Sequence, residues 1–233
     1  RQLMNRLGAL LFYTGDYSAA YSQYQQALAL AKSLHGETHA SVATTLANIG
    51  TLHQREGRHV LARQHLEGAR AMMEDLHGKN HVHTATCYAN LGIFYSQIKQ
   101  YAQAHRYCET ALEIRRAKYG DSHSLVGVTL RDLGSVEAKL GRHKVAVDHL
   151  ETAIQISRRQ FGNKHEQVVR SLYFLATALH RAGRVSSARD RLTEALNLID
   201  ETTDPRGDLY PLIVQELGFC AHKSGRFTEA EKH

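Results

Sequence analysis

Apolar residues recur along the chain with the spacing of amphipathic helices. The apolar positions of the first stretch lie on one face of a helix: Leu3, Leu7, Gly8 and Leu11. Gly15 interrupts this pattern, and glycine readily adopts the left-handed backbone conformation in which helices end. A second stretch, 17–34, again carries its small and apolar residues on one face. The sequence therefore predicts two helices joined by a tight turn.

The pattern returns with a period of 42 residues, which is the signature of a tandem repeat. Small residues hold three fixed positions of each unit: Gly8, Gly50, Gly92, Gly134, Ala176 and Gly218; Ala20, Ala62, Ala104, Ala146, Ala188 and Ala230; Ala27, Ala69, Ala111, Ala153 and Ala195. A turn residue follows in register: Gly15, Gly57, Lys99, Gly141, Gly183 and Gly225. We expect first helices near 40–56, 82–98, 124–140 and 166–182, and second helices near 59–76, 101–118, 143–160 and 185–201.

The small residues predict close contacts between the two helices of each unit, because a larger side chain would overpack such a contact. We expect the apolar face of each first helix at repeat positions 4, 7, 8 and 11. Lys99 stands where the other units have a turn glycine. If its backbone is left-handed like theirs, the conformation costs about 1 kcal/mol.

The third unit carries a resemblance to a known family. It contains the L-G-x2-Y pattern and the following alanine of the tetratricopeptide repeat, which the chain resembles: Leu91, Gly92, Tyr95 and Ala104. The longer period and a G-x-x-H motif at the first four junctions resemble the kinesin light chain type of this repeat: Gly36–His39, Gly78–His81, Gly120–His123 and Gly162–His165. The proline that follows this histidine in the family is replaced here, and its asparagine pair is represented by Asn48 and Asn90 alone.

The resemblance implies an all-α fold, a right-handed superhelical solenoid of tetratricopeptide helix-turn-helix repeats. We expect a single array over residues 1–233, with repeats near 1–42, 43–84, 85–126, 127–168 and 169–210 and a truncated repeat at 211–233. The chain starts inside one expected helix and stops early in another, and no polar capping end is recognisable. We therefore expect a fragment of a longer protein.

Composition narrows the classes of partner. The net charge of +6 favours acidic partners. Nucleic-acid binding is not expected, because lysine and arginine are spread through every repeat instead of clustering on one face. No apolar run approaches the ~20 residues that span a bilayer, and no secretory signal is present, so we expect a cytoplasmic protein without a membrane partner.

The cysteines are expected to be buried thiols of a reducing compartment: Cys87, Cys108 and Cys220.

The sequence gives no support for catalysis or metal binding. It contains no nucleophile-elbow, Walker or H-E-x-x-H motif, so we expect neither enzyme activity nor a cofactor. The 16 histidines include i, i+4 pairs at His35/His39 and His77/His81, but zinc needs three or four convergent ligands. Because these histidines recur with the junction, we expect them to hydrogen-bond the junction or cap the next helix.

Repeat positions 2, 6, 9 and 13 form a polar stripe beside the apolar face of each first helix. The resemblance implies that this stripe lines a concave groove that holds an extended peptide. Asparagine amides could hold the peptide backbone, since each offers a donor and an acceptor, and the cations would attract acidic residues. The candidate residues are Arg6, Tyr13, Asn48, Thr51, Arg55, Asn90, Ile93, Gln97, Asp132, Lys139, Arg170, Phe174 and Arg181.

These features predict a non-enzymatic protein–protein interaction scaffold or adaptor that binds an extended, acidic peptide. The resemblance implies that a cargo adaptor in motor transport is one form of this role. Two alternatives stay open. The polar stripe could be an ordinary solvated helix face, and the array could be a structural or regulatory arm of a multidomain signalling protein that acts by self-association or intramolecular contact.

Overall fold

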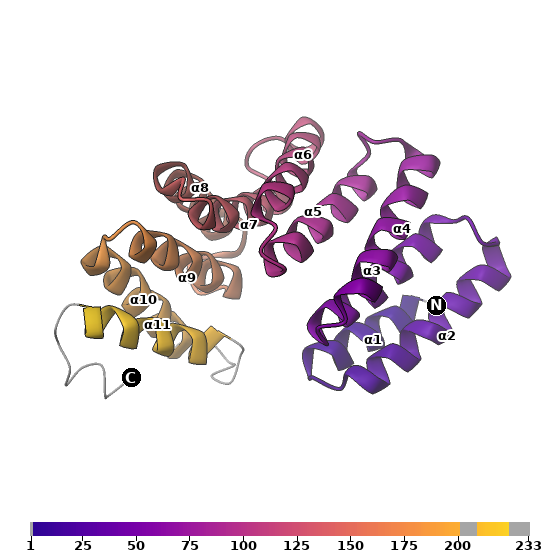
Figure 1. Cartoon of the computed structure of the whole chain (residues 1–233), viewed down its shortest axis with the longest axis horizontal. Helices are drawn as coiled ribbons and strands as arrows, with labels where there is room; N and C mark the ends of the chain where they lie inside the picture. The colour runs from indigo at the N-terminus through magenta and orange to yellow at the C-terminus, as the bar shows by residue number, and fades with distance from the viewer. Residues whose placement is uncertain (1, 201–208, 224–233) are drawn as a thin grey trace. The chain divides into compact units, whose positions relative to one another are not determined.

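The computed structural model describes residues 2–200 and 209–223, which form eleven helices and no strand (Figure 1). The helices are α1 (Gln2–Tyr13), α2 (Tyr17–His35), α3 (Ala40–Arg55), α4 (His59–His77), α5 (Val82–Gln97), α6 (Tyr101–Tyr119), α7 (Ser124–Lys139), α8 (His143–Phe161), α9 (Glu166–Arg181), α10 (Val185–Asp200) and α11 (Leu209–Lys223). The all-α prediction is confirmed, and the helix ends agree with the expected ranges to within a residue. The fifth junction, Gly225 and Ala230 lie outside the described residues.

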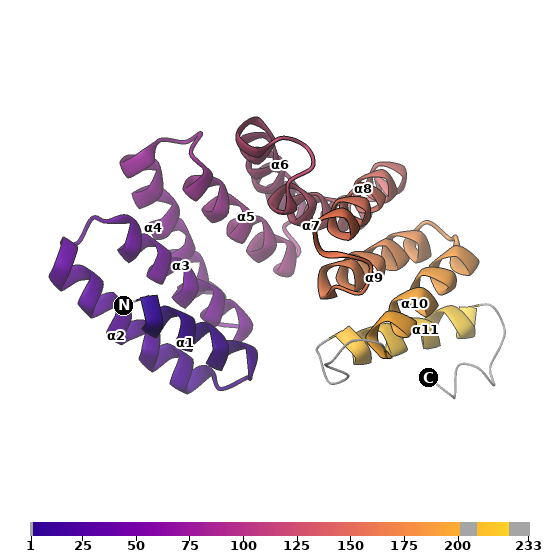
Figure 2. The same cartoon turned by 180° about the vertical axis from the view of Figure 1, so that it is seen from behind.

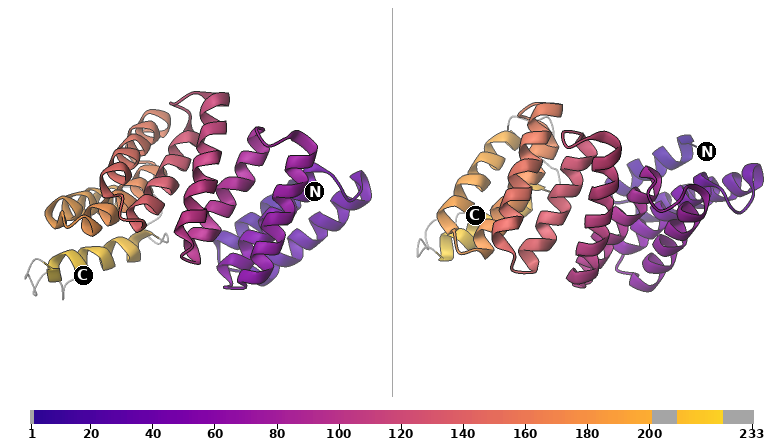
Figure 3. Two further views of the ribbon diagram at one scale, coloured as in Figure 1. Left: turned by 45° about the horizontal axis from the view of Figure 1, so that its top comes forward. Right: turned by 90° about the horizontal axis from the view of Figure 1, so that it is seen from above.

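The chain divides into two compact units, Arg1–Ile114 and Arg115–His233, with the boundary inside α6. In the first unit α1 pairs with α2 and α3 with α4, and in the second unit α7 pairs with α8 and α9 with α10 (Figures 2 and 3). First helices of successive repeats also touch. In the first unit α1 touches α3 and α3 touches α5, and in the second unit α7 touches α9 and α9 touches α11. This arrangement brings neighbouring polar stripes together within each unit. The expectation of a single array within a longer protein stays a prediction.

The small residues lie where the two helices of a pair approach most closely, as predicted. The alanines at the second and third small positions are fully buried in the described repeats: Ala20, Ala62, Ala104, Ala146 and Ala188, with Ala27, Ala69, Ala111, Ala153 and Ala195. A Cβ atom added to Gly134 of α7 would lie 2.8 Å from Leu150 Cγ of α8 and 3.1 Å from the Ala146 carbonyl oxygen. The helix spacing therefore depends on the missing side chain.

The turn between the two helices of a pair uses a left-handed residue. Gly15, Gly57, Gly141 and Gly183 have φ between 74° and 85°. Lys99 takes the same conformation with φ of 64°, which confirms the expectation for this position. The repeat geometry thus imposes the turn conformation even where the sequence does not supply a glycine.

Histidine opens the first helix after each described junction. The Nδ1 atoms of His39, His81, His123 and His165 accept a hydrogen bond from the backbone N–H two residues later at 3.1–3.3 Å. Each ring also stacks on the aromatic side chain four residues earlier, with centroids 4.2–4.6 Å apart. The expected capping role is confirmed, because an N-cap side chain satisfies a donor that the helix leaves unpaired.

The buried face of the first helices α3, α5, α7, α9 and α11 is broader than predicted and includes repeat positions 3 and 10. Leu52 and Phe94 at position 10 are buried, as are the hydroxyl residues Thr45, Thr129 and Ser171 at position 3. Each of these hydroxyls donates to the carbonyl four residues earlier, at 2.7–2.9 Å. A hydroxyl that hydrogen-bonds to a carbonyl of its own helix can be buried at a low cost in free energy. A prediction made from apolar residues alone therefore misses these buried positions.

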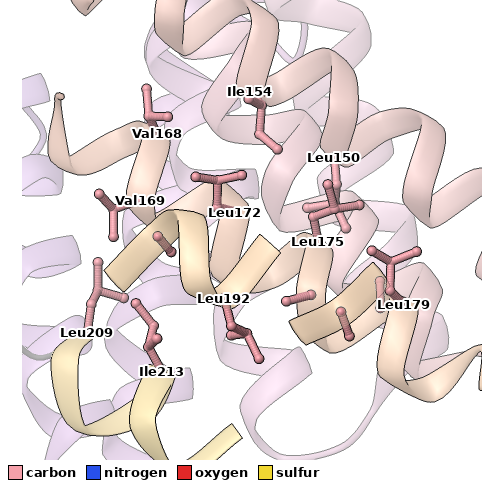
Figure 4. Close-up of a cluster of buried hydrophobic side chains, with 14 of the residues drawn as sticks. Leu150, Ile154, Val168, Val169, Leu172, Leu175, Leu179, Leu192, Leu209 and Ile213 are labelled. Atoms are coloured by element: carbon pink, nitrogen blue, oxygen red, sulfur yellow. The ribbon is translucent and has the colours of Figure 1, made fainter. Parts of the chain in front are cut away.

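An extensive buried cluster lies in the second unit and joins five helices, α7 to α11 (Figure 4). It includes Leu150 and Ile154 of α8, Val168, Val169, Leu172, Leu175 and Leu179 of α9, Leu192 of α10, and Leu209 and Ile213 of α11. Each helix pair therefore buries its apolar face against its neighbours, as repeat units do. The three cysteines are buried free thiols, which confirms their expected place in the core: Cys87, Cys108 and Cys220.

Candidate functional site

The thirteen residues predicted to contact a peptide all lie on first helices, and each of them is at least partly exposed. The first unit carries Arg6 and Tyr13 on α1, Asn48, Thr51 and Arg55 on α3, and Asn90, Ile93 and Gln97 on α5. The second unit carries Asp132 and Lys139 on α7, and Arg170, Phe174 and Arg181 on α9. Since the chain divides into two compact units, each stretch of the stripe is a candidate surface by itself.

In the first unit, the two asparagine amides are open to a partner. Asn48 and Asn90 are partly exposed, and neither side chain hydrogen-bonds to another residue in the described part of the chain. Gln97 differs, because its amide is already engaged: Gln54 Nε2 donates to Gln97 Oε1 at 2.6 Å, and Gln97 Nε2 donates to the Gln54 carbonyl at 3.3 Å. Gln97 therefore links α3 to α5, which is a structural role.

The cations and the aromatic residue of the stripe in the first unit lie on α1 and α3. The Arg55 guanidinium lies over the ring of Phe12, 5.6 Å from its centroid, and Tyr13 contacts the same ring edge-on. Arg6 is exposed on α1, and Ile93 adds an exposed apolar side chain on α5. The Thr51 hydroxyl donates to its own helix, at 3.0 Å from the Ala47 carbonyl.

In the second unit, the structure brings part of the stripe together around a hollow of about 490 Å³. Three of the thirteen predicted residues line it: Lys139, Phe174 and Arg181. The remaining lining residues are Ser135 and Ala138 of α7, Tyr173, Thr177 and His180 of α9, and Glu216 of α11. The hollow thus combines two cations with two aromatic rings on adjoining first helices.

The cations give this hollow a positive character. Burial lowers the pKa of Lys139, and the charge of Arg181 lowers it further. Among the described residues, Arg181 has no carboxylate within ion-pair distance. The two positive charges repel each other. An anion bound between them would reduce this repulsion, because an opposite charge favours the protonated form of lysine.

The acid inside the hollow already has a partner. The Nδ1 atom of His180 lies 2.6 Å from Oε1 of Glu216, so this carboxylate is occupied by the histidine. Burial raises the pKa of the Tyr173 hydroxyl, and the charge of Glu216 adds to this effect. Sequence reasoning missed these three residues. Continuing the 42-residue register from Arg6 into the sixth repeat would have placed Glu216 on the stripe.

Asp132 and Arg170 lie on the stripe but outside the lining of the hollow, and both are paired. Asp132 Oδ1 accepts from Arg131 Nη2 at 3.1 Å, and the Arg131 Nη1 donates to Gln167 Oε1 at 2.6 Å. Arg170 forms an ion pair with Glu166 one turn earlier. These contacts neutralise the one predicted acid of the stripe and one of its cations, which leaves the positive character centred on the hollow.

Two further properties concern the whole described part of the chain. No helix in residues 2–200 or 209–223 is long and apolar enough to cross a membrane. In the same residues, no group of three histidine, cysteine or carboxylate side chains is placed to hold a metal ion.

Comparison with known sequences gives one family. The profile described as tetratricopeptide repeat matches residues 1–65, 41–117, 93–157 and 125–201. These overlapping matches cover most of the chain. No curated protein matches the sequence significantly.

Several solved structures share the fold at low sequence identity. BtubC (BKLC) from P. vanneervenii is 17% identical with a TM-score of 0.75, over 91% of this chain and 85% of that chain. A set of TPR-like repeats from Podosopora anserina, assigned to a kinesin light chain, is 18% identical with a TM-score of 0.68, over 86% and 94% of the two chains. A Rap protein complexed with competence and sporulation factor is 14% identical with a TM-score of 0.70, over 99% and 74%. These likenesses show a tetratricopeptide-type helical solenoid.

Proposed function

The chain belongs to the tetratricopeptide repeat family of protein–protein interaction scaffolds, and we propose that its first-helix stripes bind an extended peptide that carries acidic residues. The observation that carries this proposal is the hollow of the second unit, where Lys139 and Arg181 lie beside Phe174. A carboxylate of the peptide would lie between the two cations, and its neighbouring side chain would pack on the aromatic ring. Charge-assisted hydrogen bonds of this kind are stronger than neutral ones.

The stripe of the first unit supports the same mode of binding. An extended peptide presents backbone N–H and C=O groups without partners, and a binding surface has to supply them. The open amides of Asn48 and Asn90 can donate to and accept from such a backbone. We propose that they hold the peptide main chain, while Arg6 and Arg55 attract its acidic side chains.

Two further observations are consistent with this role. A Rap protein of similar fold has been solved with the competence and sporulation factor bound, so a protein of this fold can hold a partner. The three buried free thiols suit a reducing compartment, and we propose the cytoplasm as the setting.

The proposal is tested by selecting displayed peptides on the protein and measuring the affinity of the enriched sequences. We expect enrichment of acidic peptides. The double substitution of Lys139→Ala and Arg181→Ala should weaken binding by about tenfold or more, because a hydrogen bond to a charged group contributes roughly 1.5–3 kcal/mol. Asn48→Ala with Asn90→Ala should weaken binding of peptides that contact the first unit.

The matched control is Lys144→Ala, which removes an exposed lysine from α8, a second helix away from the stripe. This variant should bind as the unchanged protein does, and circular dichroism should show that all variants keep their helices. Enrichment of peptides without acidic residues, or equal binding by the Lys139/Arg181 variant, contradicts the proposal.

A further inference from the structure

The hollow of the second unit has two cations at equivalent positions of successive repeats. Lys139 is the last residue of α7 and Arg181 is the last residue of α9, and these two helices touch. The two charges interact, because the charge of Arg181 adds to burial in lowering the pKa of Lys139. A carboxylate carries a single negative charge, so it can balance only one of these two cations.

Two hydroxyl groups in the hollow add further hydrogen-bond donors. Ser135 and Tyr173 line the hollow, and neither hydroxyl hydrogen-bonds to another residue in the part of the chain that the structure describes. The Thr177 hydroxyl differs, because it already donates to the Phe174 carbonyl at 2.8 Å. The ammonium, the guanidinium and the two open hydroxyls together present more donors than the two oxygens of a carboxylate are suited to accept.

The hollow also keeps an excess of positive charge. Within the described residues, Glu216 is the one carboxylate that lines it, and Glu216 Oε1 lies 2.6 Å from the Nδ1 atom of His180. This carboxylate therefore interacts with the histidine and not with Arg181. The two cations face a single acid, so a bound group with more than one negative charge is favoured.

We propose that the hollow binds a phosphorylated side chain of the partner peptide and prefers it to a carboxylate. The inference rests on the proposed function, because it names the group that the peptide places between Lys139 and Arg181. A phosphate monoester carries about 1.5–2 negative charges at neutral pH and has three strong acceptor oxygens. Its charge can balance both cations, and its additional oxygen can accept from the hydroxyl of Ser135 or Tyr173.

The equivalent positions of the first unit lack this pair of cations. They hold Tyr13, Arg55 and Gln97. The Arg55 guanidinium lies over the Phe12 ring, 5.6 Å from its centroid, and the Gln97 amide accepts from Gln54 at 2.6 Å. We therefore expect the preference for phosphate only in the second unit.

The test uses the whole chain and short synthetic peptide libraries with phosphoserine at the centre and random flanking residues. The sequence retained most strongly by the immobilised chain is then made with serine, glutamate or phosphoserine at the centre. Fluorescence anisotropy measures the three affinities. We expect the phosphoserine peptide to bind about tenfold more tightly than the glutamate peptide, because it forms more charge-assisted hydrogen bonds, and the serine peptide to bind most weakly.

Two variants assign the preference to the hollow. Arg181→Gln leaves one cation, so it should reduce the preference for phosphoserine over glutamate to about twofold or less. Ser135→Ala with Tyr173→Phe removes the two open hydroxyls, and it should weaken binding of the phosphoserine peptide by about threefold or more while sparing the glutamate peptide. The matched control is Lys144→Gln on α8, an exposed cation outside the hollow, which should leave all affinities unchanged. Circular dichroism should show that every variant keeps its helices.

The outcomes separate this inference from the proposed function. Equal affinities for the phosphoserine and glutamate peptides overturn the preference and leave the binding of acidic peptides standing. Absence of binding by both peptides contradicts the proposed function and this inference with it. An unchanged preference in Arg181→Gln would show that the phosphate binds elsewhere. Displacement by inorganic phosphate as effective as by unlabelled phosphopeptide would show a site for the free ion, which also overturns the proposal.

Discussion

Gly50 of α3 lies so close to Leu66 of α4 that a Cβ atom at position 50 would be 2.8 Å from Leu66 Cγ and 3.2 Å from the Leu66 backbone nitrogen. The first contact could be relieved by a side-chain rotation, but the second involves the backbone of the neighbouring helix. The distance between the two helices is therefore fixed by the absence of a side chain.

We expect Gly50→Ala to destabilise the protein by about 1 kcal/mol. Overpacking costs roughly 1–3 kcal/mol, and the better helix propensity of alanine offsets about 1 kcal/mol of that. Urea unfolding followed by circular dichroism measures the difference.

Gly68 of α4 provides the matched control, because a Cβ atom there would meet nothing within 4 Å. We expect Gly68→Ala to stabilise the protein by about 0.5–1 kcal/mol, since only the propensity effect remains. The two substitutions should therefore have opposite signs. A stabilising effect at both positions would show that the packing at Gly50 is not limiting.

The left-handed turn at Lys99 leads to a second prediction. Its φ of 64° is unfavourable for a residue with a side chain. We expect Lys99→Gly to raise the free energy of unfolding by about 1 kcal/mol, because glycine adopts this conformation without the steric cost.

The converse substitution is Gly57→Ala, at the equivalent turn with φ of 74°. It should lower the free energy of unfolding by about the same amount. Thermal unfolding of the two variants measures both effects. A loss of stability in Lys99→Gly would show that the lysine side chain contributes more than its backbone conformation costs.

The sequence predicted the helices and their contacts well because these depend on a fixed period. Once Gly8 and Gly50 are recognised as equivalent, each helix pair follows from the first. The capping role of His39 and its equivalents could be predicted for the same reason, since the motif recurs at every described junction.

The candidate site was predicted less completely because it depends on contacts between unlike side chains. The stripe positions are at least partly exposed, and their role in binding stays a prediction. The link between Gln54 and Gln97 and the pair of His180 with Glu216 each occur in a single place. A periodic pattern contains no information on such pairs. They depend on which two side chains meet across neighbouring helices, and this requires the coordinates.

Buried His53 leads to a prediction on pH. Burial lowers the pKa of His53, and the nearby charge of His65 acts in the same direction, as does that of Arg58. Glu56, whose Oε2 lies 3.2 Å from the His53 Nδ1, raises it only in part. The folded protein therefore holds this ring neutral to a lower pH than the unfolded chain does.

The sign of the effect follows from proton linkage. In the unfolded chain His53 takes up a proton near its usual pKa of about 6.5, while the folded state resists protonation. The free energy of unfolding should fall as the pH is lowered through about 6.5 and below. His53→Gln should reduce this fall, which urea unfolding at about pH 7.5 and about pH 5.5 would measure. The same substitution at exposed His59 is the control, and an unchanged pH dependence in His53→Gln contradicts the prediction.

The capping histidine of the third junction leads to the last prediction. The His123 ring stacks on Tyr119 with centroids 4.3 Å apart and planes at 15°, and its Nδ1 accepts from the Leu125 backbone N–H at 3.2 Å. We expect His123→Ala to cost about 1–2 kcal/mol, because both the cap and the stacking are lost. His123→Asn should cost about half as much, since asparagine can cap the helix but cannot stack.

A double-mutant cycle with Tyr119→Leu separates the two contributions. The stacked pair should show a coupling free energy of about 0.5–1.5 kcal/mol, as aromatic pairs do beyond their buried area. The cap itself does not involve Tyr119, so His123→Asn should stay milder than His123→Ala in the Tyr119→Leu background as well. A coupling energy near zero would mean that the ring of Tyr119 only covers the junction. The recurrence of an aromatic residue four positions before each capping histidine would then be due to burial alone, and not to stacking that orients the imidazole for its hydrogen bond.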